Sequence, residues 1–291
     1  EDFDSYWTKT LKLLDKVDLA PKMDLIADRC TDKVDVYHIS FGNIKGTRMY
    51  GVLTMPKKEG KYPSILKVPG AGVHAMSGNV TWAAKGAIVL EIGIHGIPVI
   101  LESGLYSDLS NGVLSNYVLH GIENRDTYFF RRVYLGCVKA VDFLLSLPKS
   151  NGKVGVIGGS QGGMLSLATS YLDKRISATG VYFPAFCDQE AYMHGRTGGW
   201  PHFFKNKENC KKEYLETARY YDGANFARKL TAPVYYAYGY NDITCGPTTS
   251  SATYNAITAP KQVVIGANEG HWLFPEHING MWEWMIKELT K

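Results

Sequence analysis

A serine lies inside a glycine-rich turn that follows an apolar run, a pattern that supports nucleophilic catalysis. The run Val154–Ile157 leads into Gly158-Gly-Ser160-Gln-Gly162, and residues with small side chains follow. A G-x-S-x-G sequence between a strand and a helix places its serine on a strained turn, with the hydroxyl exposed above the sheet. The glycines are needed because strand and helix pack too closely there for Cβ atoms. The sequence therefore predicts that Ser160 is the nucleophile of a serine hydrolase.

A serine hydroxyl is a weak nucleophile, so it needs a base and an acid from elsewhere in the chain. Asp242 follows the apolar run 233–239, and His271 follows a second such run at 262–265. Both positions are ends of expected strands, which form the ligand-binding edge of an open α/β sheet. The order Ser, Asp, His predicts that His271 removes the proton and that Asp242 orients the imidazole.

Three other residues compete for the roles of acid and base. Asp222 precedes a helix-like segment, where a carboxylate caps the helix N-terminus. Glu269 is close to His271 in the chain but does not directly follow the expected strand. His277 lies near the final expected helix, and we interpret it as structural.

Two backbone N–H groups are expected to stabilise the negative charge that develops on the reacting carbonyl oxygen. One belongs to Gln161, the residue after the nucleophile. The other should come from the loop Pro69–Gly72, which follows the apolar run 63–68, and we assign it to Ala71. An ordinary turn at this loop is the alternative.

Alternating strands and helices must position these residues. Residues 34–41 and 47–55 alternate in polarity, which predicts an antiparallel pair, and residues 132–147 carry apolar side chains at helical spacing. The remaining expected elements are strands at 65–68, 87–92, 176–182, 233–239 and 262–265 and helices at 161–171 and 279–289. The expected fold class is α/β: an α/β-hydrolase fold, with a mostly parallel twisted sheet flanked by helices.

The 291 residues are expected to form one domain, 1–291, because this length is ordinary for a single large α/β unit. The alternation of elements stops at about 184–226, an aromatic and polar stretch that contains Trp200. We interpret this stretch as an insertion over the active-site edge, where lids and specificity elements usually lie.

Composition and charge argue against several classes of function. The net charge is +4 and the 32 Lys and Arg are scattered, so the sequence predicts no nucleic-acid partner. No apolar run reaches the length of a membrane span, so no membrane partner is expected. Five widely spaced cysteines match no metal pattern, and the expected chemistry needs no cofactor. The chain begins with Glu1 rather than Met, which favours a removed leader and export (periplasmic or secreted) over the cytoplasm.

Several segments resemble carbohydrate esterase family 7, the acetyl xylan esterases and cephalosporin C deacetylases. The segments, which together extend over nearly the whole chain, are Asp2–Trp7, His120–Tyr134, Ala140–Phe143, Gly158–Gly163, Tyr221–Ala227, Gly239–Asp242 and Cys245–Thr249. The resemblance implies hydrolysis of acetyl esters on xylan-derived oligosaccharides or similar small esters, through an acyl-serine intermediate. It implies no cofactor, and it makes a homo-oligomer a candidate state.

Three positions depart from the family pattern. His95-Gly-Ile97 stands where the family has Arg-Gly-Gln, Trp272 follows His271 where the family has glutamate, and Ala71 replaces an aromatic residue. An alanine keeps the backbone N–H that the oxyanion loop needs. Trp272, Trp200 and His95 are candidate substrate-pocket residues, and for His95 an orienting or packing role is favoured over direct catalysis.

Two other functions stay open at this point. A prolyl-oligopeptidase-like serine peptidase shares the same order of nucleophile, acid and base, although this chain has no propeller sequence. A non-catalytic binding module with a relic site is the second alternative, and the intact set of Ser160, Asp242 and His271 argues against it.

Overall fold

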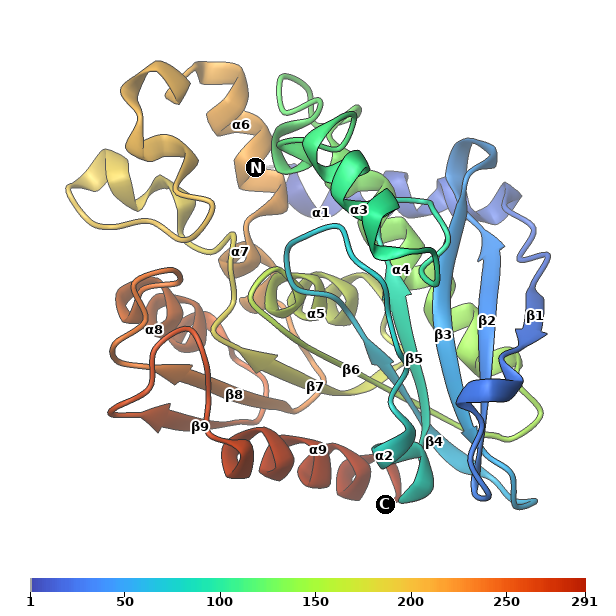
Figure 1. The fold of residues 1–291 in the computed structure, drawn as a ribbon. Coiled ribbons are helices and arrows are strands. Elements are labelled where there is room, and N and C mark those ends of the chain that lie inside the picture. The colour runs from blue at the N-terminus through green and yellow to red at the C-terminus, as the bar shows by residue number, and fades with distance from the viewer. Residues whose placement is uncertain (1) are drawn as a thin grey trace.

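The computed structural model describes residues 2–291, and one mixed β-sheet forms its centre (Figure 1). Its strands are β1 (Lys22–Leu25), β2 (Val34–Gly42), β3 (Arg48–Pro56), β4 (Tyr62–Lys67), β5 (Ile88–Gly93), β6 (Ser150–Gly159), β7 (Ile176–Tyr182), β8 (Val234–Gly239) and β9 (Lys261–Gly266). Within residues 2–291 they lie in the order β1-β2-β3-β5-β4-β6-β7-β8-β9. The neighbours β1-β2, β2-β3 and β3-β5 pair antiparallel, and all later neighbours in this order pair parallel. The predicted α/β-hydrolase-like, mostly parallel sheet is confirmed.

Helices cover both faces of this sheet (Figure 1). They are α1 (Phe3–Leu11), α2 (Val80–Ala84), α3 (Ser103–Asn111), α4 (Phe129–Ser146), α5 (Gln161–Leu172), α6 (Lys212–Tyr221), α7 (Gly223–Ala227), α8 (Pro247–Ala256) and α9 (Pro275–Leu289). A Cβ atom at Gly155 of β6 would meet Met285 of α9, whereas one at Gly158 would meet Gly162 of α5. Helices α9 and α5 therefore lie on opposite faces, and β6 runs between them.

Aromatic side chains join α1 to the rest of the molecule. Trp7 is fully buried, and its ring centre lies 5.5 Å from that of Tyr134 and 5.3 Å from that of Tyr221. The indole N–H of Trp7 donates to the backbone oxygen of Tyr220 at 3.1 Å. Truncating a buried tryptophan to alanine typically costs about 3–5 kcal/mol. The first helix is thus part of the main core and helps to hold α4 and α6 in place.

Each strand and helix that the sequence predicts is present in the structure, with its ends shifted by a few residues at most. The predicted antiparallel pair is β2 with β3, in register from Val34 opposite Pro56 to Gly42 opposite Arg48. Helix α9 begins four residues before the predicted start, with a proline in its first turn, where a missing N–H costs nothing. All four residues of β1 are exposed, so no apolar alternation indicates that strand. Helices α2, α3 and α8 are likewise not among the elements expected from the sequence.

Between β7 and β8 the chain leaves the sheet and forms α6, α7 and several short turns (Figure 1). Asp222 fastens this segment, because its buried carboxylate accepts N–H groups from Asp188 (3.0 Å), Gln189 (2.9 Å) and Ala224 (2.9 Å). Burial raises the pKa of Asp222 to about 6, although these hydrogen bonds act in the opposite direction. Asp222 caps α7, so its interpretation as a helix cap is confirmed.

Three further features concern the part of the chain that the structure describes. None of the helices in residues 2–291 combines the length and the apolar content that crossing a bilayer requires. Over the same residues, His, Cys, Asp and Glu side chains form no group of three that could hold a metal ion. The five cysteines in this range are free thiols, and three of them are buried.

Candidate active site

Ser160 lies on the sharp turn between β6 and α5. Its φ of 55° and ψ of −124° are costly for a residue with a side chain, and such strain concentrates at functional sites. The turn requires glycine nearby, because a Cβ atom at Gly162 would lie 2.5 Å from the backbone oxygen of Val68. The Ser160 N–H donates to the backbone oxygen of Tyr182 at 3.1 Å, which ties the turn to β7. This local structure places the serine at the carboxyl edge of the parallel strands.

The structure brings together the three residues predicted as nucleophile, base and acid. Nε2 of His271 lies 3.0 Å from Oγ of Ser160, and Nδ1 of His271 lies 2.8 Å from Oδ2 of Asp242. Ser160 follows β6, Asp242 follows β8, and His271 follows β9, so three strand ends supply the three groups. The ring of Phe183 packs against the imidazole, with 4.5 Å between ring centres.

The Asp242 carboxylate is fixed by backbone hydrogen bonds. Its side chain is fully buried, and Oδ1 accepts the N–H groups of Thr244 and Cys245, both at 2.8 Å. The other oxygen, Oδ2, is the one that contacts His271. This arrangement leaves one carboxylate oxygen directed at the imidazole, as an orienting acid requires.

The competing carboxylate, Glu269, is engaged elsewhere. It is buried, its Oε2 accepts the N–H of Phe274 at 2.8 Å, and its Oε1 lies 2.8 Å from Nδ1 of His277. Glu269 therefore holds the start of α9. These contacts agree with the structural role expected for His277.

A buried network holds the loop 69–72 against the start of α5. The Gln161 side chain is fully buried; its Nε2 donates to the backbone oxygen of Gly70 at 3.1 Å, and its Oε1 accepts from the Tyr117 hydroxyl at 2.8 Å. The same hydroxyl accepts the N–H of Gly72 at 3.1 Å. As the first residue of α5, Gln161 has a backbone N–H with no intrahelical acceptor. Its backbone can therefore serve an oxyanion while its side chain positions the opposite loop.

His95 supports the same loop from another side. Its Nε2 lies 3.0 Å from the backbone oxygen of Gly72, and its ring packs edge-on against Tyr117 with 4.5 Å between centres. Nδ1 of His95 is buried without a hydrogen-bond partner among residues 2–291. Burial lowers the pKa of His95, so the neutral ring, with its proton on Nε2, suits these contacts. Ala71 is exposed in this loop, and its N–H stays our prediction for the second oxyanion donor.

A cavity of about 570 Å³ opens beside the nucleophile, and we call it the nucleophile cavity. It is lined by residues 67–70, 74–81, 159–160 and 182–183 together with Glu91. Trp272, Trp200 and His95 do not line it. No sequence pattern indicates Lys67 and Glu91 as site residues, because each lies within an apolar run that predicts a buried strand.

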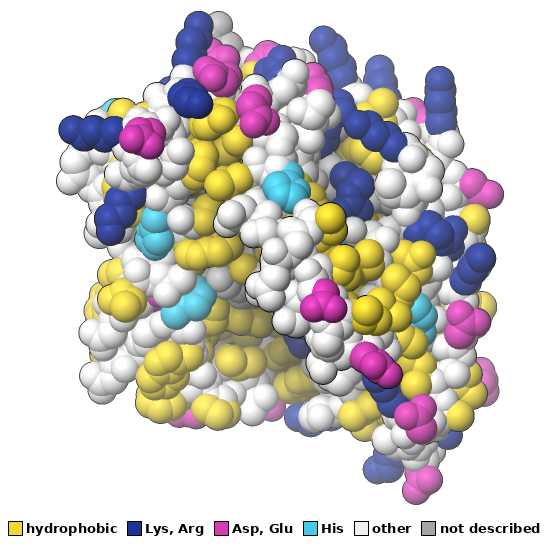
Figure 2. Space-filling view, turned by 45° about the horizontal axis from the view of Figure 1, so that its top comes forward, with side chains coloured by type: hydrophobic (Ala, Val, Ile, Leu, Met, Phe, Trp, Pro, Cys, Tyr) yellow, Lys and Arg dark blue, Asp and Glu magenta, His cyan; other side chains and the backbone are white. Residues whose placement is uncertain are grey.

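The two tryptophans predicted for the substrate pocket lie outside the nucleophile cavity. Trp272 is 49% exposed and packs edge-on against Phe274, with 5.0 Å between ring centres. Trp200 is half-buried and packs edge-on against Phe186 at 5.3 Å. On the face drawn in Figure 2, hydrophobic side chains border a central hollow, and most Lys and Arg side chains lie toward the margin.

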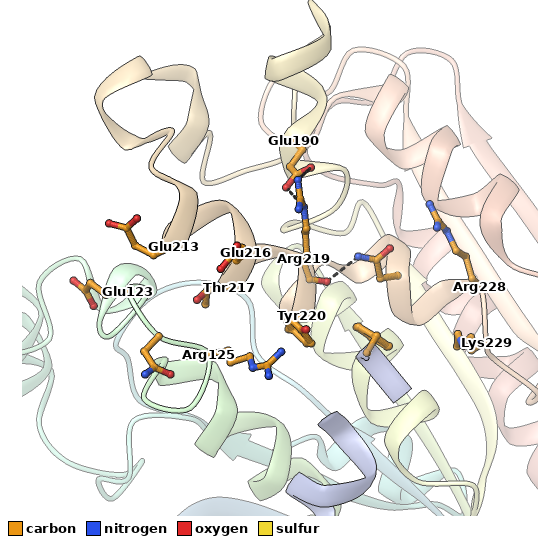
Figure 3. Close-up of a pocket in the computed structure, with 13 residues that line it drawn as sticks. Glu123, Arg125, Glu190, Glu213, Glu216, Thr217, Arg219, Tyr220, Arg228 and Lys229 are labelled. Carbon is orange, nitrogen blue, oxygen red and sulfur yellow. Dashed lines mark hydrogen bonds and ion pairs between the residues drawn. The ribbon is translucent and has the colours of Figure 1, made fainter. Parts of the chain in front are cut away.

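A larger cavity, of about 900 Å³, shares no lining residue with the nucleophile cavity, and we call it the outer cavity. It is lined by Phe3 of α1, residues 123–125, Glu190, residues of α6, Asn225, Arg228 and Lys229 (Figure 3). Nε of Arg219 lies 2.6 Å from Oε1 of Glu190, so two of the charged lining residues contact each other. Among the described residues around it there is no Ser, Cys or His. The predicted nucleophile, Ser160, lines the smaller cavity instead.

Comparison with known proteins identifies the family. Residues 1–288 match the acetyl xylan esterase (AXE1) family. The acetyl esterase Axe7A of Xylanibacter ruminicola is 38% identical over 295 aligned positions, which cover 99% of this chain and 67% of that protein. The structure of an acetyl xylan esterase from Paenibacillus sp. R4 is similar with a TM-score of 0.83 and 27% identity, covering 98% of this chain and 94% of that one.

Acetyl xylan esterase 1 from Thermoanaerobacterium sp. JW/SL YS485 has the same fold, with a TM-score of 0.84 and 22% identity over 99% of this chain and 94% of that one. The chain belongs to the acetyl xylan esterase family, and it is a carboxylic ester hydrolase. The resemblance to carbohydrate esterase family 7 is confirmed.

Proposed function

We propose that this hydrolase removes acetyl groups from carbohydrates, such as acetylated xylan or xylo-oligosaccharides, through an acetyl-Ser160 intermediate. The observation that carries the proposal is the hydrogen-bonded series from Ser160 through His271 to Asp242. Family membership supports the choice of ester, since a relative at 38% identity is named an acetyl esterase and two similar structures are named acetyl xylan esterases.

The first half of the reaction transfers the acetyl group to the enzyme. Nε2 of His271 takes the proton from Oγ of Ser160 as that oxygen bonds to the acetyl carbonyl carbon. The carbonyl π electrons move onto the carbonyl oxygen, and Asp242 stabilises the imidazolium. When the tetrahedral intermediate collapses, the bond to the sugar oxygen breaks, and His271 gives that oxygen its proton. The sugar leaves as an alcohol and acetyl-Ser160 remains.

The second half releases acetate by the same groups in the same roles. A water molecule bonds to the acetyl carbon while His271 removes its proton, and the ester bond to Ser160 then breaks as Oγ regains a proton. In both halves the negative oxygen is stabilised by the backbone N–H of Gln161 and by the 69–72 loop. Tyr117 and the Gln161 side chain keep that loop at a fixed distance from α5.

Labelling and a substrate panel test this proposal. A serine-reactive fluorophosphonate should label Ser160 alone, and labelling elsewhere would contradict the assignment of the nucleophile. Acetylated xylo-oligosaccharides and aryl acetates should be hydrolysed, whereas aryl esters from butyryl to octanoyl should be progressively poorer. Each methylene that does not fit costs about 1–3 kcal/mol of transition-state binding. A maximum at hexanoyl or longer would indicate a lipase-like pocket, and efficient cleavage of a proline-containing peptide amide would favour a peptidase.

A further inference from the structure

Two charged residues face the nucleophile cavity from the ends of the central strands. Lys67 of β4 and Glu91 of β5 are register partners, and Nζ of Lys67 lies 2.5 Å from Oε1 of Glu91. Neighbouring positions on these strands, such as Leu66 and Leu90, are fully buried and apolar. Parallel strands covered on both faces are normally apolar throughout. Packing of the sheet therefore does not explain why a charged pair occupies this position.

Hydrogen bonds hold the pair in place, but they do not use all the N–H donors of Lys67. Glu91 is 7% exposed, and its Oε2 accepts the N–H of Gly78 at 3.1 Å, which fastens the 74–81 segment over the cavity. The Lys67 side chain is 37% exposed. An ammonium group has three N–H donors, and within residues 2–291 Glu91 is the sole hydrogen-bond acceptor of Lys67. Donors of Lys67 are thus free to meet a ligand in the cavity.

The pair lies in the same cavity as the nucleophile, so a substrate whose ester reaches Ser160 can also contact the pair. Ser160 and Gly159 line the same cavity, and so does Phe183, which packs on the imidazole of His271. The cavity volume of about 570 Å³ falls within the range of roughly 300–1,000 Å³ typical of small-molecule sites. A molecule seated there can place an ester group against Ser160 while the rest of it reaches Lys67.

The chemistry of the cavity selects the kind of molecule. An ammonium paired with a carboxylate has no net charge, so an anionic group gains little from Lys67 and is opposed by Glu91. An aliphatic alcohol would bury both charges without offering hydrogen bonds, which is costly. Hydroxyl groups both donate and accept, so they can bond to both members of the pair. Asn79 and Tyr182, which also line the cavity, carry polar side-chain groups.

We propose that Lys67 and Glu91 form a sugar-binding subsite that hydrogen-bonds the hydroxyl groups of a neutral sugar ring, whose acetyl ester is thereby presented to Ser160. The subsite holds the alcohol side of the ester, because an acetyl methyl group offers nothing to a charged pair. This inference rests on the proposed deacetylation of carbohydrates and assigns its specificity to two residues outside the triad.

The test compares a sugar ester with an ester that lacks hydroxyl groups. For Lys67→Met, kcat/KM on acetylated xylo-oligosaccharides relative to 4-nitrophenyl acetate should fall about ten- to a hundred-fold, the equivalent of one hydrogen bond to a charged group. The loss should lie mainly in KM, because the contact is made before and during the reaction. Lys58→Met is the matched control: Lys58 is exposed in the turn between β3 and β4, and its variant should leave both activities unchanged.

A second variant guards against misfolding, since Lys67→Met leaves Glu91 buried and unpaired. Lys67→Gln keeps an N–H donor toward Glu91, and its effect is measured by inhibition. Xylobiose should inhibit the hydrolysis of 4-nitrophenyl acetate competitively in the wild type. Its Ki should be at least five-fold higher in the variant. Parallel loss on both esters, or equal inhibition of both proteins by xylobiose, would overturn the subsite. A wild-type enzyme that hydrolyses neither ester would instead overturn the proposed function.

Discussion

The nucleophile cavity and the outer cavity contain the same kinds of charged residue but arrange them differently. Four basic and four acidic residues line the outer cavity, and two of them, Arg219 and Glu190, contact each other. In the nucleophile cavity one pair, Lys67 with Glu91, stands beside a hydroxyl that is hydrogen-bonded to a histidine. The larger hollow, about 900 Å³ against about 570 Å³, is thus the one without a nucleophile. Convergence of reactive groups, more than volume, distinguishes a catalytic site.

Backbone conformation separates the two cavities in the same way. Ser160 and Phe183 line the nucleophile cavity with φ values of 55° and 33°, in the left-handed region that side chains disfavour. Among the described residues that line the outer cavity, none has a positive φ. Strain of this kind persists only where surrounding structure imposes it. Of the two cavities, the nucleophile cavity is the one with such strained positions in its lining, and one of them is the predicted nucleophile, Ser160.

The largest expected effect follows from removing the nucleophile. Ser160→Ala should lower kcat on the order of 10⁶-fold, as observed for triad serines, because no other hydroxyl is hydrogen-bonded to His271 within residues 2–291. The fold should persist, because the hydroxyl makes no packing contact that alanine lacks. Steady-state kinetics with 4-nitrophenyl acetate measures the loss of kcat. A thermal melt shows whether the variant is folded. Near-normal turnover by the folded variant would move the chemistry away from this cavity.

The next largest effect separates the two buried carboxylates near His271. Asp242→Asn should lower kcat on the order of 10⁴-fold, because an amide N–H facing Nδ1 favours the wrong imidazole tautomer. Glu269→Gln is the matched control, and the turnover of its folded fraction should change by less than about ten-fold, since Glu269 contacts Phe274 and His277. The reverse ranking of the two variants would show that the acid is misassigned.

The meeting of Ser160, His271 and Asp242 was predictable because each of them follows a recognisable strand in the required order. Turn signals and apolar runs are local, so Ser160, Asp242 and His271 could be placed at one sheet edge without coordinates. The sheet itself was predictable for the same reason, except for strands such as β1, whose exposed residues carry no apolar pattern.

The cavity lining could not be predicted in this way. Lys67 and Glu91 meet because β4 and β5 are neighbours in a particular register, which no local pattern encodes. Tyr117 reaches Gln161 from 44 residues away, out of a stretch without periodicity. Trp272 is adjacent to His271 in the chain, but it does not line the nucleophile cavity. Consecutive side chains of a loop can point in different directions, so adjacency in the sequence does not place a residue in the cavity.

A smaller effect is expected from loosening the oxyanion loop. Tyr117→Phe removes the hydroxyl that joins Gly72 to Gln161, so the Gly72 N–H and the buried Oε1 of Gln161 both lose this partner. We expect kcat to fall about ten-fold on aryl acetates and sugar acetates alike, because small misplacement of catalytic groups is costly. Tyr62→Phe is the control, since its hydroxyl bonds the backbone of Lys58 at the other end of β4. A loss confined to sugar acetates would make Tyr117 a substrate contact instead.

The smallest effect is expected at the outer cavity. It tests whether the outer cavity, unlike the nucleophile cavity, takes no part in the reaction. Arg219→Gln breaks the ion pair with Glu190 in the lining of that cavity (Figure 3). Because the Arg219 side chain is 59% exposed, the pair should contribute less than about 1 kcal/mol to stability. We expect kcat/KM on acetylated xylo-oligosaccharides to stay within two-fold of the wild type, and the Glu190→Gln variant to match it. A ten-fold loss in either variant, without a change in the melting temperature, would mean that a long substrate extends from the nucleophile to the outer cavity. In that case the larger hollow would be a distal part of the same binding site.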